Sequence, residues 1–375
     1  MKKLLRRSGA ALLAACTIYV TAATVECQSV PAAIQAARDS FHLPTALTQL
    51  ALGDITGGRS ISLSALLCLR QSPLLWAAYG KLPAEEDNTD AEQAAPEEAA
   101  PEAVTLSAGS AEETAGLTFA DNGAPSQTVI PTSAKNYTVA GSVYMKNGSG
   151  QTIDTSLLDG SFPATLGSSD APQVLILHTH GSEAYTMPAG EEYTASGDYR
   201  TMDTEKNMIR VGDEMAAILA QYGISVLHDR EIHDTDYNSA YDESYDSAAA
   251  YLEKYPSISF VLDIHRDAIS DADGKQYKVV SQEDAHAAQL SIILGSNYEA
   301  WMANLRLAYA VQAHLLESHP TLMRPMTIRS CGYNQSLSTG YLLVEVGAAG
   351  NSLDEAIYAA RIFAAGFAEV IGGSK

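Results

Sequence analysis

The chain has 375 residues, with 23 lysines and arginines against 45 aspartates and glutamates, which gives a formal net charge of −22. This acidity excludes binding to nucleic acid through electrostatic attraction, because binding phosphates requires clustered positive charge. The four cysteines are Cys16, Cys27, Cys68 and Cys331, and their spacing builds neither a disulfide framework nor a cysteine metal site. Any metal must therefore be bound by histidine and carboxylate side chains.

Residues 1–30 have the pattern of a signal anchor. Four positive charges within residues 2–7 precede an apolar run at about residues 9–25. Positive charge keeps this end in the cytoplasm, so we expect a single-pass protein of the cell membrane whose remaining chain is extracytoplasmic. The run is near the lower length limit for a span, and the small residues before Cys16 leave a lipoprotein processing site as the alternative.

Residues 31–135 connect this anchor to the rest of the chain. Residues 31–81 form a juxtamembrane region of unclear structure, in which Arg70 and Pro73 interrupt an apolar stretch and favour an interfacial segment over a second span. Residues 82–135 form a linker whose first part is rich in Ala, Glu and Pro and has no basic residue. Like charges repel and little apolar surface can be buried, so we expect a flexible tether.

Residues 136–375 alternate short apolar runs with amphipathic stretches, which is the pattern of an α/β domain. Strands are expected at residues 174–177, 224–227, 258–264, 288–294 and 341–346, and helices at 204–223, 239–255, 298–317 and 352–371. In the first of these helices, Met208, Val211 and Met215 recur on one face. We predict a mostly parallel sheet covered by helices on both faces.

Three expected strands end in groups suited to metal and proton chemistry. The strand at 174–177 runs into a loop with His178, His180 and Glu183, the strand at 258–264 runs into His265, and the last strand contains Glu345. Ligand sites in open α/β sheets lie at the carboxyl ends of strands. A catalytic zinc site takes about three imidazole or carboxylate ligands and leaves one position open to water. A histidine beside a strand is often only structural, but several at neighbouring strand ends favour Zn²⁺.

The sequence resembles the stage II sporulation protein P family over residues 137–375. The resemblance rests on VLILHTHGSEAY at residues 174–185, LDIHRDA at 262–268, and YNQ at 333–335 followed by LLVEVGAAGN at 342–351. The family is related to zinc-dependent N-acetylmuramoyl-L-alanine amidases. The resemblance implies a zinc amidase-like fold and a hydrolase that remodels septal peptidoglycan during sporulation and engulfment. It also implies an endopeptidase activity and a partner, a stage II sporulation protein D-like lytic transglycosylase.

The resemblance also implies zinc ligands: a strand-end histidine, a helix-start glutamate and a second strand-end histidine. His180 takes the first place because a glycine follows it, and His178 is then the alternative ligand or a substrate contact. Glu205, near the expected helix start, takes the second place, with Glu183 as its rival. His265 takes the third.

Glu345 is the expected catalytic base, as the last-strand glutamate of the related amidases. It lies in the apolar run 342–346, where an unpaired carboxylate is costly. An ion pair with Arg266 or Arg329 would offset that cost, whereas burial beside a metal-activated water would raise its pKa toward the range a base needs. Arg266 and Arg329 are also candidates to bind a stem-peptide carboxylate or an oxyanion, and Asn334 is a candidate to line the substrate site.

Two other functions fit parts of this pattern. A strand followed by His-x-His also opens other metal-dependent amidohydrolases, but only about 195 residues follow His180, fewer than the roughly 250 of their (β/α)₈ barrel. A catalytically idle peptidoglycan-binding module would not require His180, His265 and Glu345 together.

Overall fold

The computed structural model describes residues 113–168 and 170–373. The expected anchor, the juxtamembrane region and the first part of the linker lie outside the described residues. Among the residues that are described, no helix combines the length and apolar character needed to cross a membrane.

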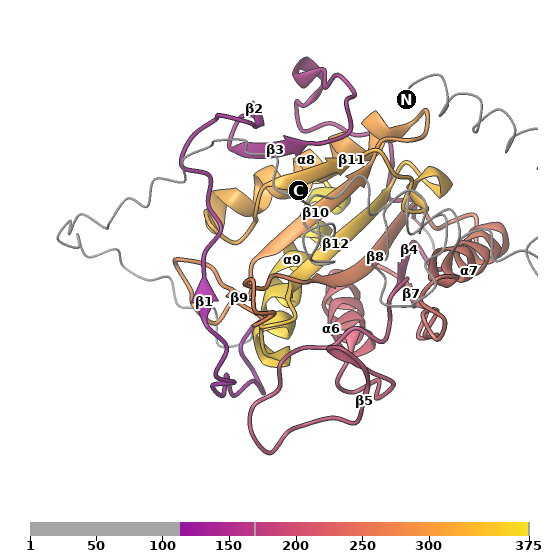
Figure 1. Cartoon of the computed structure of the whole chain (residues 1–375). Coiled ribbons are helices and arrows are strands. Elements are labelled where there is room, and N and C mark those ends of the chain that lie inside the picture. Colours follow the sequence, from indigo (N-terminus) through magenta and orange to yellow (C-terminus); the bar gives the residue numbers. More distant parts are fainter. Residues whose placement is uncertain (1–112, 169, 374–375) are drawn as a thin grey trace, which may run out of the picture. The chain divides into compact units, whose positions relative to one another are not determined.

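A central sheet of eight strands organises the described part of the chain (Figure 1). Its strands are β2 (Thr138–Ala140), β3 (Val143–Asn147), β4 (Val174–Leu177), β7 (Val226–His228), β8 (Phe260–Asp267), β10 (Leu290–Gly295), β11 (Met326–Arg329) and β12 (Tyr341–Ala348). The spatial order is β2-β3-β11-β10-β12-β8-β4-β7. Of the seven pairings, only β2 with β3 and β10 with β12 are antiparallel, so the predicted mostly parallel sheet is confirmed.

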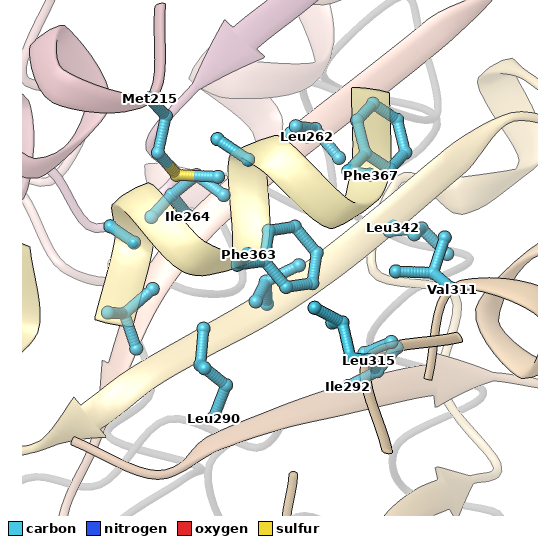
Figure 2. Close-up of a cluster of buried hydrophobic side chains, with 14 of the residues drawn as sticks. Met215, Leu262, Ile264, Leu290, Ile292, Val311, Leu315, Leu342, Phe363 and Phe367 are labelled. Carbon is cyan, nitrogen blue, oxygen red and sulfur yellow. The ribbon is translucent and has the colours of Figure 1, made fainter. Parts of the chain in front are cut away.

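Helices cover both faces of this sheet, as the sequence predicts. They are α6 (Met208–Gln221), α7 (Ala240–Lys254), α8 (Trp301–Ser318) and α9 (Leu353–Gly372). Successive strand residues point to opposite faces. Ile264 on β8 belongs to the large core formed with α6, α8 and α9, in which Phe363 and Phe367 are fully buried (Figure 2). Val261 on the same strand belongs to a smaller cluster with Ala248 of α7.

Short elements complete the domain and extend it upstream. They are β1 (Ser126–Gln127), β5 (Ala195–Gly197), β6 (Arg200–Thr201), β9 (Lys278–Val279) and the 3₁₀ helices η1 (Thr155–Leu157) and η2 (Gln335–Leu337). β1 pairs in parallel with β9, and the Asn122 side chain donates to the carbonyls of Thr186 and Gly350. The folded domain therefore begins before residue 136, and its upstream segment takes in part of the expected linker.

The start of α6 differs from the sequence prediction. The helix begins at Met208, because the Asn207 side chain accepts a hydrogen bond from the Ile209 amide at 3.0 Å and caps it. The side-chain amide of Asn207 also donates a hydrogen bond to the Thr201 carbonyl. Glu205 consequently lies in the turn before the helix and not in its first turn.

Candidate active site

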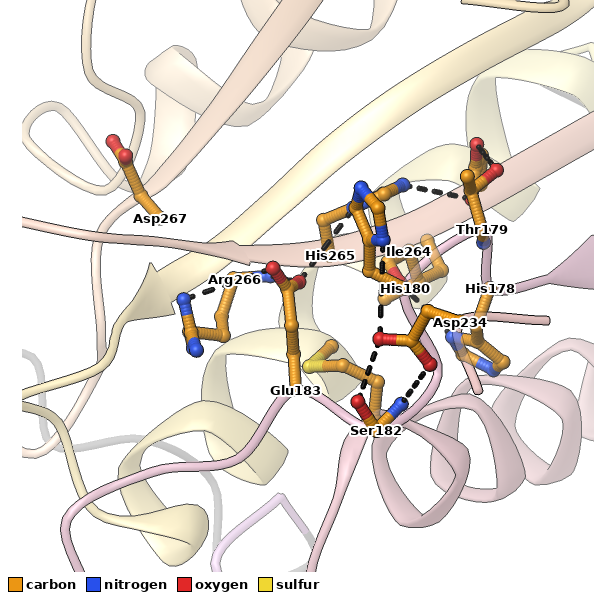
Figure 3. A network of polar contacts seen from close by, with 12 residues as sticks. His178, Thr179, His180, Ser182, Glu183, Asp234, Ile264, His265, Arg266 and Asp267 are labelled. Carbon is orange, nitrogen blue, oxygen red and sulfur yellow. Dashed lines mark hydrogen bonds and ion pairs between the residues drawn. The ribbon is translucent and has the colours of Figure 1, made fainter. Parts of the chain in front are cut away.

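Three strand ends meet at one edge of the sheet and form the candidate site (Figure 3). β4, β8 and β12 are neighbours that run parallel, so their carboxyl ends lie together. The loop after β4 contains His180 and Glu183, β8 contains His265, and β12 contains Glu345, the register partner of His265. His180, His265 and Glu345, three of the residues that the sequence prediction assigned to the site, therefore lie at this edge.

His178 does not belong to this group, although it is two residues from His180. Its side chain is completely buried, with Nδ1 2.9 Å from the Ile264 carbonyl and Nε2 2.9 Å from Nε2 of His228. Burial, and then the nearby His228, lower the pKa of His178 to about 3. A buried, neutral imidazole held by the backbone is structural, so neither predicted role for His178, alternative ligand or substrate contact, fits its position.

His180 and His265 face each other across the site. Their ring centroids lie 5.4 Å apart and the rings are nearly perpendicular, while the Tyr237 ring stacks on His180 at 4.7 Å. His180 Nδ1 is buried without a hydrogen-bond partner, and burial, followed by His265, lowers the pKa of His180 to about 4. Burial alone would lower the pKa of His265, but the Asp263 and Glu183 carboxylates outweigh it and raise that pKa well above its usual range.

The carboxylate beside these histidines is Glu183. Its side chain is 8% exposed, and Oε2 lies 3.6 Å from His265 Nδ1 and accepts a hydrogen bond from the Arg266 amide. Burial would raise the pKa of Glu183, but the Arg266 guanidinium and His265 hold it well below its usual range. Glu183 is therefore an ionised carboxylate placed next to an imidazole nitrogen.

Glu205, the carboxylate that the sequence prediction put first, lies elsewhere. Its side chain is 70% exposed and faces Arg230 at 3.9 Å. The physical reason is the cap of α6, which leaves Glu205 in a solvent-facing turn held by Asp203. The structure brings Glu183 to the histidines and does not bring Glu205 there.

Glu345 has the environment expected of a poised base. Its Oε2 atom is buried and has no hydrogen-bond partner. Burial, and next the negative charge of Asp267, raise the pKa of Glu345 to about 8. Neither Arg266 nor Arg329 forms a salt bridge with it in the described chain, so the alternative of a structural ion pair is not realised.

Two predicted substrate residues hold the scaffold together. Arg266 is 7% exposed, and its side chain donates to the carbonyls of Ala184 and Tyr199, which fixes the segment after Glu183. Asn334 has a left-handed backbone with φ of 57° and its side-chain amide donates to the Tyr241 carbonyl. Both side chains already bind backbone carbonyls of the protein, so their predicted contact with substrate stays a prediction.

Arg329 differs from these two, because it is the exposed last residue of β11. Burial alone would lower the pKa of Arg329. Tyr333, and to a smaller extent Asp267 and Glu345, outweigh burial and raise this pKa above its ordinary value. Arg329 therefore lies within electrostatic reach of the candidate base and remains a candidate for binding a substrate carboxylate.

Three charged residues of the site were not found from the sequence. Asp263 contacts His265 Nε2 at 2.9 Å, and its position inside an apolar strand is the signal that could have found it. Asp234 lies 3.8 Å from His180 Nδ1 and accepts hydrogen bonds from the Ser182 amide and hydroxyl. Arg200 pairs with both Asp234 and Glu183. Asp234 comes from an irregular segment and Arg200 from the two-residue strand β6, and neither has a sequence pattern that marks it.

The donor chemistry of the site fits the Zn²⁺ that the resemblance implies. Two imidazoles and one ionised carboxylate face one another, and His180 Nδ1 makes no hydrogen bond, with the Asp234 carboxylate 3.8 Å away. Across the described ranges, however, no group of three or more His, Cys, Asp or Glu side chains is arranged so that it could hold a metal ion. The residue types suit zinc, but their present arrangement does not form a metal site, and Arg200 shares the Glu183 carboxylate.

Solved structures of N-acetylmuramoyl-L-alanine amidases are similar to part of this chain. The amidase AmiC2 of Nostoc punctiforme is 18% identical, with 55% of this chain and 94% of that chain covered and a TM-score of 0.32. The amidase from Clostridium difficile 630 is 13% identical, with coverages of 55% and 100% and a TM-score of 0.35. The CwlD amidase from Clostridioides difficile, solved with the GerS lipoprotein, is 12% identical, with coverages of 53% and 94% and a TM-score of 0.33.

Sequence comparison gives the family. Stage II sporulation protein P of Bacillus subtilis (strain 168) is 25% identical over an alignment of 226 residues, and the match covers 56% of this chain. The match spans only 53% of that relative's length, about half. The family model described as stage II sporulation protein P matches residues 78–368, well over half of the chain. The chain therefore belongs to the stage II sporulation protein P family.

Proposed function

We propose that this protein is a zinc-dependent N-acetylmuramoyl-L-alanine amidase that removes stem peptides from peptidoglycan during sporulation. The observation that carries the proposal is the meeting of His180, Glu183 and His265 beside Glu345, whose Oε2 is buried without a partner. Family membership supports a role in the sporulation cell wall.

His180, Glu183 and His265 would hold the metal, with Glu183 in the place that the sequence prediction gave to Glu205. When bound there, zinc would polarise the amide carbonyl and make a bound water more acidic. Asp263 and Asp234 lie beside the two histidines and would keep their rings in place.

Glu345 carries the proton in this mechanism. Its Oε2 would accept a proton from the attacking water while the oxygen of that water bonds to the lactyl carbonyl carbon. Glu345 would then deliver the proton to the nitrogen of the departing L-alanine as the C–N bond breaks. The products are a carboxylate on the glycan and a peptide with a free amino terminus. Without metal, a pKa of about 8 keeps Glu345 protonated at neutral pH. The positive charge of a bound zinc ion would lower this pKa and so would free the carboxylate to accept a proton.

The chain around the site would recognise the substrate. Arg329 is the residue best placed to bind a carboxylate of the stem peptide, because it is exposed and lies near Glu345. We further propose that the catalytic domain works outside the cytoplasm, held by the N-terminal segment, with a stage II sporulation protein D-like lytic transglycosylase that cuts the glycan. An endopeptidase activity of the same site would use the same amide chemistry.

The fold bears on the two alternative functions, a barrel-type metal-dependent amidohydrolase and a binding module without activity. The sheet ends at β2 and β7 and contains antiparallel pairings, so the described residues do not form the closed parallel barrel of many metal-dependent amidohydrolases. A binding module without activity remains the second candidate, because it would share the family and the fold.

One digestion separates the two candidates. Purified peptidoglycan is incubated with the protein, with the protein plus a chelator, and with Glu345→Gln, each with and without a lytic transglycosylase, and the products are identified by mass spectrometry. We expect free stem peptides with an N-terminal alanine only from the untreated wild type. Cleavage that persists in chelator, or no peptide release even with the transglycosylase present, would refute the zinc amidase.

A further inference from the structure

Asp263 is a fully buried acidic residue next to the site. It lies on β8 with no exposed surface. Oδ1 accepts a hydrogen bond from the Thr179 amide at 2.9 Å, and Oδ2 accepts from the Thr179 hydroxyl at 2.7 Å and from the Tyr341 hydroxyl at 3.2 Å. A buried carboxylate is costly unless donors surround it, and here the loop after β4 and the first residue of β12 supply these donors.

The same carboxylate meets one particular nitrogen of His265. Asp263 Oδ1 lies 2.9 Å from His265 Nε2 as an ion-pair contact, although Nε2 has no partner with hydrogen-bond geometry, whereas the other ring nitrogen, Nδ1, lies 3.6 Å from Glu183 Oε2. The two nitrogens of an imidazole point in different directions, so a fixed partner at Nε2 decides which nitrogen faces Glu183. His265 is 4% exposed, and its ring cannot turn without breaking these contacts.

Thr179, which donates two hydrogen bonds to Asp263, belongs to the loop that contains the other candidate ligands. Thr179 stands next to His180, and its hydroxyl also contacts the Ser244 hydroxyl of α7 at 2.9 Å. The carboxylate that meets His265 is thus tied to the same loop that carries His180 and Glu183. A shift of that loop would move Asp263 and the His265 ring together.

We propose that Asp263 is a positioning residue that fixes the His265 ring so that Nδ1, and not Nε2, is presented beside Glu183 to a bound metal. This inference rests on the proposed function, because it concerns the metal site that function requires. A histidine ligand whose second nitrogen is held by a carboxylate gains a fixed orientation and a more basic donor.

Asp263→Asn in the full chain tests the proposal, because the amide keeps the size of the side chain and removes its charge. Zinc affinity is measured by competition with a chromophoric chelator, and nitrogen-15 NMR of the zinc-loaded protein identifies the coordinating nitrogen of His265. We expect Nδ1 coordination in the wild type and a zinc affinity roughly 10–100-fold weaker in Asp263→Asn. Asp229→Asn is the matched control, because Asp229 forms a buried pair with His233 at 2.9 Å that includes none of the candidate ligands. Its zinc affinity should equal that of the wild type.

A milder variant covers the case in which Asp263→Asn does not fold. Tyr341→Phe removes only one donor to Asp263, and we expect a few-fold loss of zinc affinity with Nδ1 coordination retained. Coordination through Nε2 in the wild type, or wild-type zinc affinity in every folded variant at Asp263 and Tyr341, would overturn the inference. Zinc bound as expected without any peptide release would instead refute the proposed hydrolase and leave the role of Asp263 standing.

Discussion

Glu345 is a partly buried carboxyl group on β12 that holds its proton unusually tightly. Its pKa rises from 4.5 to about 8, first because of burial and then because of the nearby Asp267 carboxylate. Such a group links the chemistry of the site to the stability of the fold, because the folded and unfolded chains bind its proton differently.

The sign of this linkage gives a testable pH dependence. Between about pH 4.5 and pH 8 the folded chain keeps a proton at Glu345 that the unfolded chain has lost. The favourable contribution is fully present below pH 4.5 and is lost as the pH rises through about 8, at a cost on the order of a few kcal/mol. In chelator, we expect Glu345→Gln to lose less stability than the wild type between pH 5 and pH 9, measured by urea unfolding. Glu205→Gln, an exposed carboxylate, should behave as the wild type, and an unchanged pH dependence in Glu345→Gln would contradict the assignment.

The choice between two glutamates is a second test at the scale of residues. Glu183 lies beside His265, whereas the Glu205 side chain is 70% exposed. We expect Glu183→Gln to lower zinc affinity and peptide release by more than roughly a hundredfold, and Glu205→Gln to stay within about twofold of the wild type. Chelator competition and product release measure the two effects. The reverse pattern would restore Glu205 as the ligand.

At the scale of elements, α6 packs against the strands that carry the site, and one glycine permits this. A Cβ atom on Gly212 would lie 2.5 Å from Nε2 of both His178 and His228. The helix can therefore approach β4 and β7 only because this position has no side chain. His178, which the sequence made a candidate for the site, and His228 are in this way part of the packing between α6 and the sheet.

Gly212→Ala should accordingly destabilise the fold by about 1–3 kcal/mol, the usual cost of overpacking a core. Urea unfolding at pH 7 measures the change. Gly372→Ala is the matched control, because Gly372 is also helical and has no heavy atom within 4 Å of an added Cβ. It should be neutral or slightly stabilising, since alanine favours helix. Equal effects of the two substitutions would contradict the close approach of α6 to the histidines.

At the scale of the whole molecule, the described domain is joined to a long N-terminal part of the chain whose sequence predicts an anchor and an acidic tether. A strongly acidic protein gains little from attraction to anionic lipid, so an apolar segment would have to supply membrane attachment. The domain's own upstream residues, around Asn122, are packed against it and would fix where the tether ends.

Deleting residues 2–30 tests this attachment. We expect the intact chain to sediment with membranes after cell lysis and the shortened chain to remain in the supernatant, because the deletion removes the apolar run at about residues 9–25 that the sequence predicts to span the bilayer. Washing the membranes with high salt is the control, since a surface-bound protein would be released by it. Sedimentation of the shortened chain with membranes would refute the anchor.

Local patterns in the sequence were sufficient to predict much of this protein. Apolar runs and helical periodicity predicted the α/β domain, four of its helices and the strands that end at the site. They also placed His180, His265 and Glu345 at strand ends, because parallel strands put such residues on one edge. β11 was missed because its four residues have no long apolar run.

The tertiary structure decided what depends on contacts between distant residues. It selected Glu183 over Glu205 because Asn207 caps α6, and it buried His178 against Ile264 and His228. It also placed Asp263 beside His265 and packed the segment around β1 onto the domain. The sequence by itself determined which residue types reach the edge of the sheet, since that follows from local pattern. Only the folded chain decided which of them face one another, because long-range packing and burial set those distances.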